Sequence, residues 1–254
     1  MAIIVKSDQE IALMRKAGRI TAEVLEMMAK NIRPGVRTAD IDAIAVRELK
    51  RLGATSSFKG YHGYPATVCT SVNDEIVHGI PGKRVLNEGD IVSLDFGVIY
   101  MGFQGDTAVT VNVGKISDEA RKLIEATEGA LMAGIAAAVD GARLGDVSAA
   151  VQAYAEGKGY AVIREYTGHG IGREMHEDPL IPNFGVPGTG PVLKKGMTLA
   201  IEPMLTSGDW HTKVGNDNWT VYTMSGKNAA HFEHTIVITD GAPEILTVRE
   251  GVHA

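Results

Sequence analysis

Apolar side chains recur at helical spacing in four stretches of the chain, and each stretch has a capping residue at its start. The first begins after Ser7, with Glu10 at capping-box spacing, and stops near Pro34-Gly35. Its core-facing positions are Ile11, Met14, Gly18, Thr21, Leu25 and Met28. The pattern predicts a long amphipathic helix at the start of the chain.

Three further helices are expected from the same signals. Thr38 is the predicted cap of a helix that ends at Gly53 and turns Ile41, Ile44, Leu49 and Leu52 to the core. Ser117 starts an alanine-rich helix to about Val139, and Asp146 starts another to about Lys158. Helix, helix and strands therefore follow one another twice along the chain.

Strands are predicted where β-branched residues cluster between glycine-containing turns. Residues 91–111 favour an antiparallel hairpin, and further strands are expected over residues 66–70, 160–166, 197–202 and 232–238. The glycine-rich segment 168–172 and the Pro/Gly segment 179–191 are expected to be loops.

Two aspartates on the predicted hairpin are the first indication of chemistry. If the turn is Met101-Gly102, Asp106 pairs with Gly97 and Asp95 pairs with Ala108, so both carboxylates project from one face. Two ionised carboxylates within an apolar sheet are costly unless they bind a cation. The alternative is that both cap turns and face water, as most charged residues do.

The two halves of the chain repeat weakly at an offset of about 106 residues. Gly35-Val36-Arg37 corresponds to Gly141-Ala142-Arg143, and the histidines of Gly60-Tyr61-His62-Gly63 and Thr167-Gly168-His169-Gly170 fall in register. By the same offset Asp95 falls on Glu202, which ends an apolar strand. No low-complexity linker separates the halves, so we expect one domain, 1–254, with halves of roughly 1–114 and 115–254.

Composition narrows the class of protein. Apolar residues make up 44% of the 254 residues and charged residues 22%, as in ordinary globular proteins. A net charge of -6 argues against general nucleic-acid binding, because there is no basic excess to neutralise phosphates. One cysteine, Cys69, excludes an intrachain disulfide, and no apolar run reaches the roughly 18 residues of a membrane span. We therefore expect a cytoplasmic protein with no membrane association.

Further ligand-type residues join the hairpin aspartates. Glu202 occupies the place of Asp95 in the second half, Glu233 heads a β-branched run as the counterpart of Asp106, and His169 lies between glycines. Four carboxylates and one imidazole suffice for two divalent ions about 3.5–4 Å apart. A ligand set dominated by oxygen favours manganese, iron, cobalt or magnesium over a thiolate-type zinc site.

These motifs resemble the type I methionine aminopeptidases, metallopeptidases of the pita-bread fold, nearly from end to end, and the absence of a long insertion or of an N-terminal extension resembles the short bacterial form. The matching stretches are Gly60-Tyr61-His62-Gly63-Tyr64-Pro65, Asn73, Val77-His78-Gly79-Ile80-Pro81, Asp95-Phe96-Gly97, Gly105-Asp106-Thr107, Gly168-His169-Gly170-Ile171-Gly172, Ile201-Glu202-Pro203 and Glu233-His234-Thr235. The resemblance implies an α+β pita-bread fold, in which a pseudo-two-fold antiparallel sheet core is flanked by two pairs of helices.

The resemblance also implies a dinuclear metal site. Asp95 would bind one metal, His169 and Glu202 the other, and Asp106 and Glu233 both. The ions would be divalent, with cobalt, manganese, iron, zinc and nickel all open.

The implied activity is removal of an N-terminal methionine when the second residue is small. Glu202 would accept the proton of the attacking water, while His78 and His176 would contact the substrate amide and the tetrahedral intermediate. The substrate-binding residues would be Phe58, Tyr61, His62, Tyr64, Cys69, His78, Met175, His176 and Trp219.

Three positions depart from the family pattern and bear on the shape of the pocket. Met175 stands where an aromatic residue is usual, His231 where glutamine is usual, and Phe58 where a small residue or cysteine is common. The predicted ligands are unaffected.

Two other functions remain as alternatives. A proline-directed peptidase of the same fold would share the ligands but usually carries a large extra N-terminal domain, and a non-catalytic binding protein would typically have lost ligands. The expected partner is a peptide or nascent-chain N-terminus bound by a monomer, with no specific nucleic acid and with ribosome contact left open.

Overall fold

The computed structural model describes residues 3–248. Its helices are α1 (Asp8–Ala29), α2 (Thr38–Leu52), α3 (Asp118–Ala137) and α4 (Leu144–Gly157). The backbone N–H of Glu10 donates to Ser7 Oγ, and the Ser7 N–H donates to Glu10 Oε2 at 3.0 Å, which closes the predicted capping box. Ser117 caps α3 in the predicted way by accepting the Ala120 N–H at 3.1 Å.

The predicted starts of α2 and α4 were wrong by one or two residues. The cap of α2 is Arg37 rather than Thr38, and α4 begins at Leu144 after the cap Arg143 rather than at Asp146. In both helices an aspartate in the first turn accepts the N–H of the arginine, at 3.1 Å for Asp40 and 2.8 Å for Asp146. The capping carboxylate therefore lies inside the helix and reaches backwards, which placed the predicted starts too late.

Within residues 3–248 nine strands form one large sheet. The members are β1 (Thr55–Ser56), β2 (Cys69–Val72), β4 (Ile91–Tyr100), β5 (Phe103–Asn112), β7 (Thr167–Gly170), β8 (Glu177–Pro182), β9 (Thr198–Ile201), β14 (Glu233–Val237) and β15 (Glu244–Ile245). The main path of the sheet runs β1-β4-β5-β14-β9-β7-β8, while β2 pairs with β4 and β15 with β14.

Two smaller sheets complete the β structure of the described residues. One has the order β13-β10-β6 and the other the order β11-β12-β3. Their strands are β3 (Glu75–Val77), β6 (Ala161–Val162), β10 (Met204–Thr206), β11 (Thr212–Val214), β12 (Val221–Thr223) and β13 (Ala229–His231).

The hairpin formed by β4 and β5 has the predicted register. Asp95 pairs with Ala108 and Gly97 pairs with Asp106, around a turn at Met101 and Gly102. Both turn residues have positive φ, 48° and 78°, as a two-residue turn that matches the twist of antiparallel strands requires. The two aspartates therefore project from one face of the sheet.

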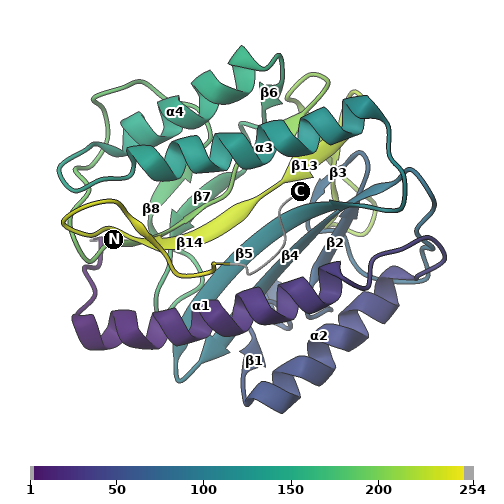
Figure 1. Ribbon diagram of the computed structural model, residues 1–254, viewed down its shortest axis with the longest axis horizontal. Helices are drawn as coiled ribbons and strands as arrows, with labels where there is room; N and C mark the ends of the chain where they lie inside the picture. The colour runs from purple at the N-terminus through teal and green to yellow at the C-terminus, as the bar shows by residue number, and fades with distance from the viewer. Residues whose placement is uncertain (1–2, 249–254) are drawn as a thin grey trace.

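The four helices cover the other face of the sheet, with α1 and α2 over one half and α3 and α4 over the other (Figure 1). Leu94 and Phe96 flank Asp95 in β4, are fully buried, and belong to the same apolar cluster as Leu25 and Met28 of α1. Burying such a side chain contributes about 1.5–3 kcal/mol. Alternation along β4 thus turns the apolar side chains to the helices and the carboxylate away from them.

Several predicted strand and loop boundaries were wrong. The strand expected over 66–70 lies at Cys69–Val72, and only Ala161–Val162 of the segment 160–166 is a strand. The expected loops at 168–172 and 179–191 instead supply most of β7 and most of β8, which pair with each other, and within the second segment only residues 183–191 contain neither helix nor strand. Glycine and proline obscured these strands because β8 is an edge strand, where proline is tolerated.

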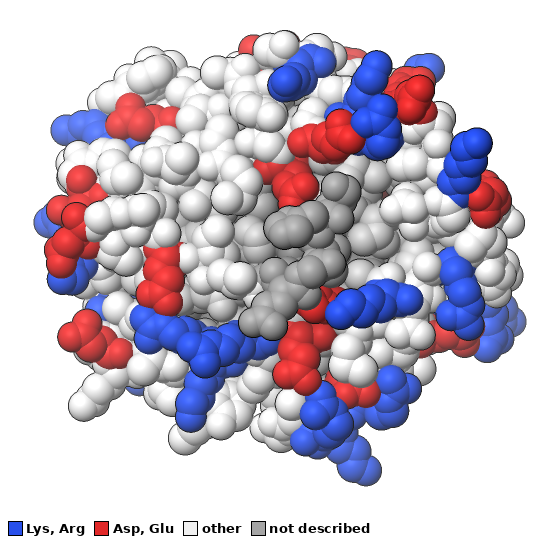
Figure 2. All heavy atoms as spheres, viewed as in Figure 1, with Lys and Arg blue, Asp and Glu red and all other residues white. Residues whose placement is uncertain are grey.

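Figure 2 shows one face of the molecule, on which basic and acidic side chains are interspersed. This mixture agrees with a net charge of -6 and gives no continuous basic surface on that face. Among the described helices, none combines the length and the apolar character needed to cross a membrane.

Candidate metal centre

The strand register brings Asp95, Asp106 and Glu233 onto one face of the sheet. Ala108 of β5 pairs with Asp95 on one side and with Glu233 of β14 on the other. Directly paired residues project in the same direction, and so do residues two apart in a strand, such as Asp106 and Ala108. Three strands therefore each present a carboxylate to the same space.

His169 and Glu202 reach this face through β9. Ala200 pairs with His169 of β7 and with Thr235, which is two residues beyond Glu233 in β14. Glu202 follows Ala200 by two residues, directly after the end of β9. The five predicted ligands thus share one face, and His169 lies on a strand rather than in the expected loop.

The protonation of His169 can be read from its hydrogen bond. Its Nδ1 lies 2.9 Å from the carbonyl oxygen of Gly170, which can only accept, so Nδ1 carries the hydrogen. The lone pair is then on Nε2, which lies 3.5 Å from Glu202 Oε1. A carbonyl that fixes the tautomer in this way is typical of histidines that bind metals.

The side chains fit divalent cations. Single ligand atoms of Asp106, His169 and Glu233 all lie within 4.8 Å of one another. Asp95 is 9% exposed, and its buried Oδ1 has no hydrogen-bond partner among residues 3–248. Oxygen and imidazole ligands suit manganese, iron and cobalt, and a buried carboxylate oxygen without a protein partner needs a cation or a proton.

Threonine hydroxyls hold the backbone of two of the predicted ligands, and this role of the threonines was not predicted from the sequence. Thr235 Oγ1 accepts the backbone N–H of Asp106 at 3.0 Å and donates to its carbonyl oxygen at 2.8 Å. Thr107 Oγ1 donates to the carbonyl oxygen of Glu233 at 2.6 Å. The hydroxyls replace ladder hydrogen bonds between β5 and β14, and β-branched residues in strands carry no sequence signal for this role.

Without a cation, the buried carboxylates of this site favour their protonated forms. Burial, followed by repulsion from Asp106, raises the pKa of Asp95 well above its ordinary value. Burial raises the pKa of Asp106 to about 7, against a hydrogen bond from the Thr107 N–H. Burial and then the charges of Asp95 and Asp106 also raise the pKa of Glu202. A cation among these groups would favour their charged forms instead.

The neighbouring histidines are held neutral. Burial, followed by repulsion from His176, lowers the pKa of His169 to about 3 and that of His78 to about 4. Partial burial, followed by the nearby His62, lowers the pKa of His176 as well. Each imidazole can therefore donate one hydrogen bond without carrying a charge near pH 7.

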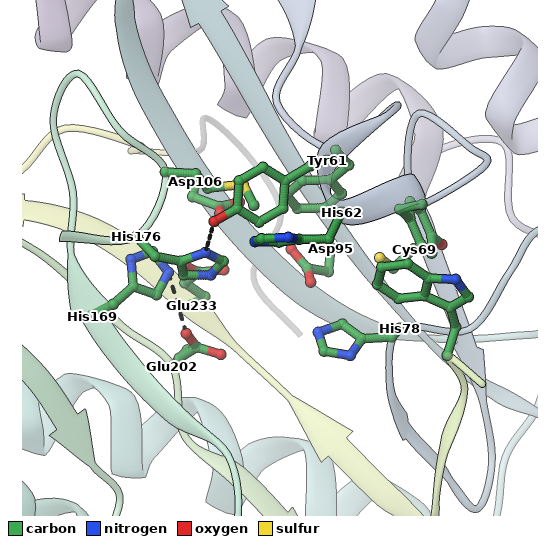
Figure 3. A pocket seen from close by; sticks show the side chains of 14 residues that line it. Tyr61, His62, Cys69, His78, Asp95, Asp106, His169, His176, Glu202 and Glu233 are labelled. Atoms are coloured by element: carbon green, nitrogen blue, oxygen red, sulfur yellow. Dashed lines mark hydrogen bonds and ion pairs between the residues drawn. The ribbon is translucent and has the colours of Figure 1, made fainter. Parts of the chain in front are cut away.

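An apolar pocket adjoins the carboxylates. Its buried wall is formed by Phe58, Tyr64, Cys69 and Met175, with Trp219 packed at its edge and the Trp219 and Tyr64 ring centroids 5.1 Å apart. Figure 3 shows the acids and histidines of the metal centre pointing into the same hollow. The lining consists of Phe58, Tyr61, His62, Tyr64, Cys69, His78, Asp95, Asp106, His169, Met175, His176, Glu202, Trp219 and Glu233. The structure thus brings together every site residue named from the sequence.

The three departures from the family pattern lie at or beside this cavity. Phe58 and Met175 are both 6% exposed and belong to its apolar wall. His231 is 1% exposed, its Nε2 lies 3.6 Å from Glu202 Oε2, and neither ring nitrogen has a hydrogen-bond partner among the described residues. Burial, followed by His78, lowers the pKa of His231 to about 3.

Comparison with known proteins agrees with this fold and with the acidic and imidazole side chains on the face of the sheet away from the helices. The sequence profile of metallopeptidase family M24 matches residues 12–240. The chain belongs to this metallopeptidase family.

Within the family the chain is similar to methionine aminopeptidases. It is 53% identical to the methionine aminopeptidase of Clostridium acetobutylicum over 98% of this chain and 100% of the relative. It is 51% identical to methionine aminopeptidase 1 of Bacillus subtilis over 96% and 99%. The crystal structure of the methionine aminopeptidase from Thermotoga maritima superposes with a TM-score of 0.96 at 49% identity, covering 98% of this chain and 100% of that one.

A peptidase of different specificity shares the fold. The Xaa-Pro dipeptidase from Bacillus anthracis matches with a TM-score of 0.78 at 26% identity, covering 97% of this chain but 63% of its own. The matches to both kinds of peptidase confirm the predicted pita-bread fold.

Proposed function

We propose that this chain is a metal-dependent aminopeptidase that removes the N-terminal methionine from peptides and nascent proteins when the second residue is small. The observation that carries the proposal is the pocket, in which an apolar slot for one side chain opens onto buried carboxylates and an imidazole. Its near end-to-end similarity to proteins named methionine aminopeptidase supports the same activity.

The proposed ligands are those predicted from the sequence. Asp95 would hold one divalent ion, His169 and Glu202 the second, and Asp106 and Glu233 both. Such ions lower the pKa of a bound water and polarise the scissile carbonyl. Cobalt, manganese, iron, zinc and nickel remain open, because the affinity of such a site and the supply of metal both determine which ion is bound.

The protein groups would move and hold protons around the scissile amide. Glu202, itself one of the proposed ligands, would take a proton from the attacking water and pass it to the leaving nitrogen. Tyr61 Oη lies 2.7 Å from His176 Nδ1, and a hydrogen bond donated to this nitrogen would leave Nε2–H to donate to substrate. His78 would donate a second hydrogen bond as the carbonyl carbon becomes tetrahedral.

The apolar wall would bind the methionine side chain. Phe58, Tyr64 and Trp219 offer aromatic edges, and Cys69 and Met175 offer polarisable sulfur, both of which favour contact with a thioether. His62, exposed beside Tyr61, would lie near the second substrate residue, where limited space admits only small side chains.

We propose a monomeric, cytoplasmic protein of one domain, whose halves divide near residues 114 and 115. Ribosome contact would be tested by co-sedimentation with ribosomes that carry a nascent chain.

The test is cleavage of Met-X-Ser peptides by protein stripped of metal and then titrated with manganese. We expect turnover to need metal and to be far faster with alanine than with leucine at X. Equal turnover of the two would contradict the proposed specificity, and preferential cleavage of an Xaa-Pro peptide would favour the dipeptidase alternative.

A variant separates the enzyme from a non-catalytic binding protein. Asp106→Ala should lose manganese binding and activity together, because the side chain is proposed to bind both ions. Asp118→Ala, which removes a largely exposed carboxylate at the start of α3, is the matched control and should keep both properties. Full activity of Asp106→Ala without metal would overturn the proposal.

A further inference from the structure

The segment 172–177 connects β7 to β8 and carries two pocket residues, Met175 and His176. The backbone N–H of Gln104 donates to the Gly172 carbonyl at 2.8 Å, and its side-chain amide donates to the Arg173 carbonyl at 3.2 Å. The start of β5 therefore supports the first half of the segment, but these hydrogen bonds do not reach His176.

A carboxylate at the end of the segment turns back and ties that end to the start of the segment. Glu177 directly follows His176, and its Oε1 accepts the backbone N–H of Arg173 at 2.9 Å. Its Oε2 accepts a hydrogen bond from Lys6 Nζ at 2.5 Å. The Lys6 and Glu177 side chains are only 4% and 6% exposed, so the pair is removed from water.

The surrounding backbone is shaped around this ion pair. A Cβ at Gly172 would lie 2.5 Å from both Glu177 Oε1 and Lys6 Cε, so a side chain there would displace the pair. The Lys6 backbone N–H donates to the Gly196 carbonyl at 2.8 Å, and Val5 forms a bridge with Met197 ahead of β9. Figure 1 shows this N-terminal segment entering α1 from the side of the molecule that carries β7 and β8.

We propose that Lys6 is a positioning residue that holds His176 in place through Glu177. This inference rests on the proposed function, in which His176 contacts substrate. Lys6 neutralises a buried carboxylate one residue from His176, while Tyr61 Oη lies within hydrogen-bond distance of the His176 imidazole. Without the ammonium group, Glu177 turns towards water and releases the N–H of Arg173, and the segment that carries His176 moves with it.

The first experiment compares three variants on Met-Ala-Ser with manganese. Lys6→Met should lower kcat tenfold or more and leave the manganese affinity, measured by calorimetry, within about twofold of wild type. Lys6→Met/Glu177→Gln keeps an acceptor for the Arg173 N–H without a buried charge, and its kcat should be at least threefold higher than that of Lys6→Met. Lys30→Met removes a lysine from an exposed ion pair with Glu26 and should change neither quantity.

A second measurement does not depend on activity. In protein labelled with nitrogen-15 histidine, the ring signals of His176, assigned with His176→Gln, should shift in Lys6→Met and not in Lys30→Met, while those of His169 stay in place. If Lys6→Met does not fold, the double variant, which buries no unpaired charge, is compared with wild type in the same way. Its His176 signals should shift to a small extent, because the glutamine amide at position 177 restores the acceptor for the Arg173 N–H but not the ion pair.

These outcomes separate the inference from the proposed function. Unmoved His176 signals, wild-type kcat in Lys6→Met, or a kcat loss matched by an equal loss of manganese affinity would each overturn the positioning role. Failure of the wild-type protein to cleave Met-Ala-Ser would overturn the proposed function, and the NMR comparison would still decide whether Lys6 positions His176.

Discussion

Asp106 of β5 is only 4% exposed, and its backbone N–H and carbonyl oxygen are both hydrogen-bonded to the hydroxyl of Thr235 in β14. The folded chain removes this carboxylate from water and places it near Asp95 and Glu202, so protonation is the response when no cation is bound. The burial that raises the pKa of Asp106 would also favour binding of a divalent ion, because a cation would stabilise the charged carboxylate.

Relative to Asp106→Asn, the metal-free protein should lose stability as pH rises. The comparison removes the opposite effect of His78, His169 and His231, which are neutral in the folded protein and ionise below about pH 6.5 when it unfolds. The folded-state pKa of Asp106, about 7, lies above the ordinary value of 3.8, so its contribution to stability is complete below pH 3.8 and is lost as pH rises through about 7. In that window one such group changes the free energy of unfolding by about 1.4 kcal/mol per pH unit. Urea denaturation with a chelator present, from about pH 5 to about pH 8, measures this slope.

Asp106→Asn is the matched control because it keeps the shape of the side chain without its titration. The substitution should reduce the dependence of the free energy of unfolding on pH by roughly the contribution of one proton. The reduction should be larger still because Asp95 and Glu202 lose a repelling neighbour. Equal slopes for the two proteins would show that Asp106 is already ionised in the folded metal-free state.

At the scale of elements, the hairpin of β4 and β5 sets the geometry of the site. Its register aligns Asp95 with Glu233 through Ala108 and leaves Asp106 two residues away. A slip by one residue between β4 and β5 would place the two aspartates on opposite faces, with one of them turned towards the helices, where Leu94 and Phe96 are packed. The two-residue turn therefore specifies that both carboxylates share one face.

Met101→Asn should stabilise the protein without changing activity. Met101 has φ of 48° and is 68% exposed, so its side chain makes little contact and its backbone conformation is strained. Asparagine followed by glycine is preferred in such a turn, and relief of the strain should add about 0.5–1 kcal/mol. Thermal unfolding should show a rise of a few degrees, whereas a lower melting temperature would contradict this description of the turn.

At the scale of the whole molecule, the two halves repeat the same local construction. Gly35 and Gly141 have φ of 89° and 84°, and their N–H groups donate to the carbonyl oxygens of Leu86 and Leu193 at 2.8 and 3.0 Å. Arginines cap the following helices in the same way. We infer that the offset of about 106 residues reflects two related halves, and that the metal centre lies between them because each contributes strand-borne acids.

Close packing between distant segments leads to a prediction that opposes helix propensity. Gly18 lies inside α1, where alanine would ordinarily be favoured by about 1 kcal/mol. A Cβ at this position would lie 2.3 Å from the carbonyl oxygen of Leu246, so Gly18→Ala should lower the free energy of unfolding by about 1–3 kcal/mol. Urea denaturation measures the change.

Gly157 provides the comparison at the end of α4. Among residues 3–248, and apart from its chain neighbours and the backbone of its own helix, no atom lies within 4 Å of a Cβ built there, and Gly157→Ala should therefore raise the free energy of unfolding by up to about 1 kcal/mol. If both substitutions were stabilising, the contact between α1 and the segment around Leu246 would be looser than the structure indicates.

Local signals predicted much of the fold. The starts of α1 and α3 followed from Ser7 and Ser117, and the hairpin register followed from a turn that needs positive φ. The short strands β6, β7 and β8 were missed or misplaced, because glycine, proline and short length hide a strand whose pairing partners are distant in sequence.

The sequence by itself determined the four acids, His169 and the order of the helices, because these depend on side-chain chemistry and on neighbours within a few residues, while the family resemblance supplied His78, His176 and the apolar residues of the pocket. Only the tertiary structure decided the tautomer of His169, the hydroxyl supports from Thr107 and Thr235, and the burial of Lys6 against Glu177. The contacts of Thr107, Thr235 and Lys6 join residues far apart along the chain, and a hydrogen bond or ion pair of this kind leaves no periodic pattern in the sequence.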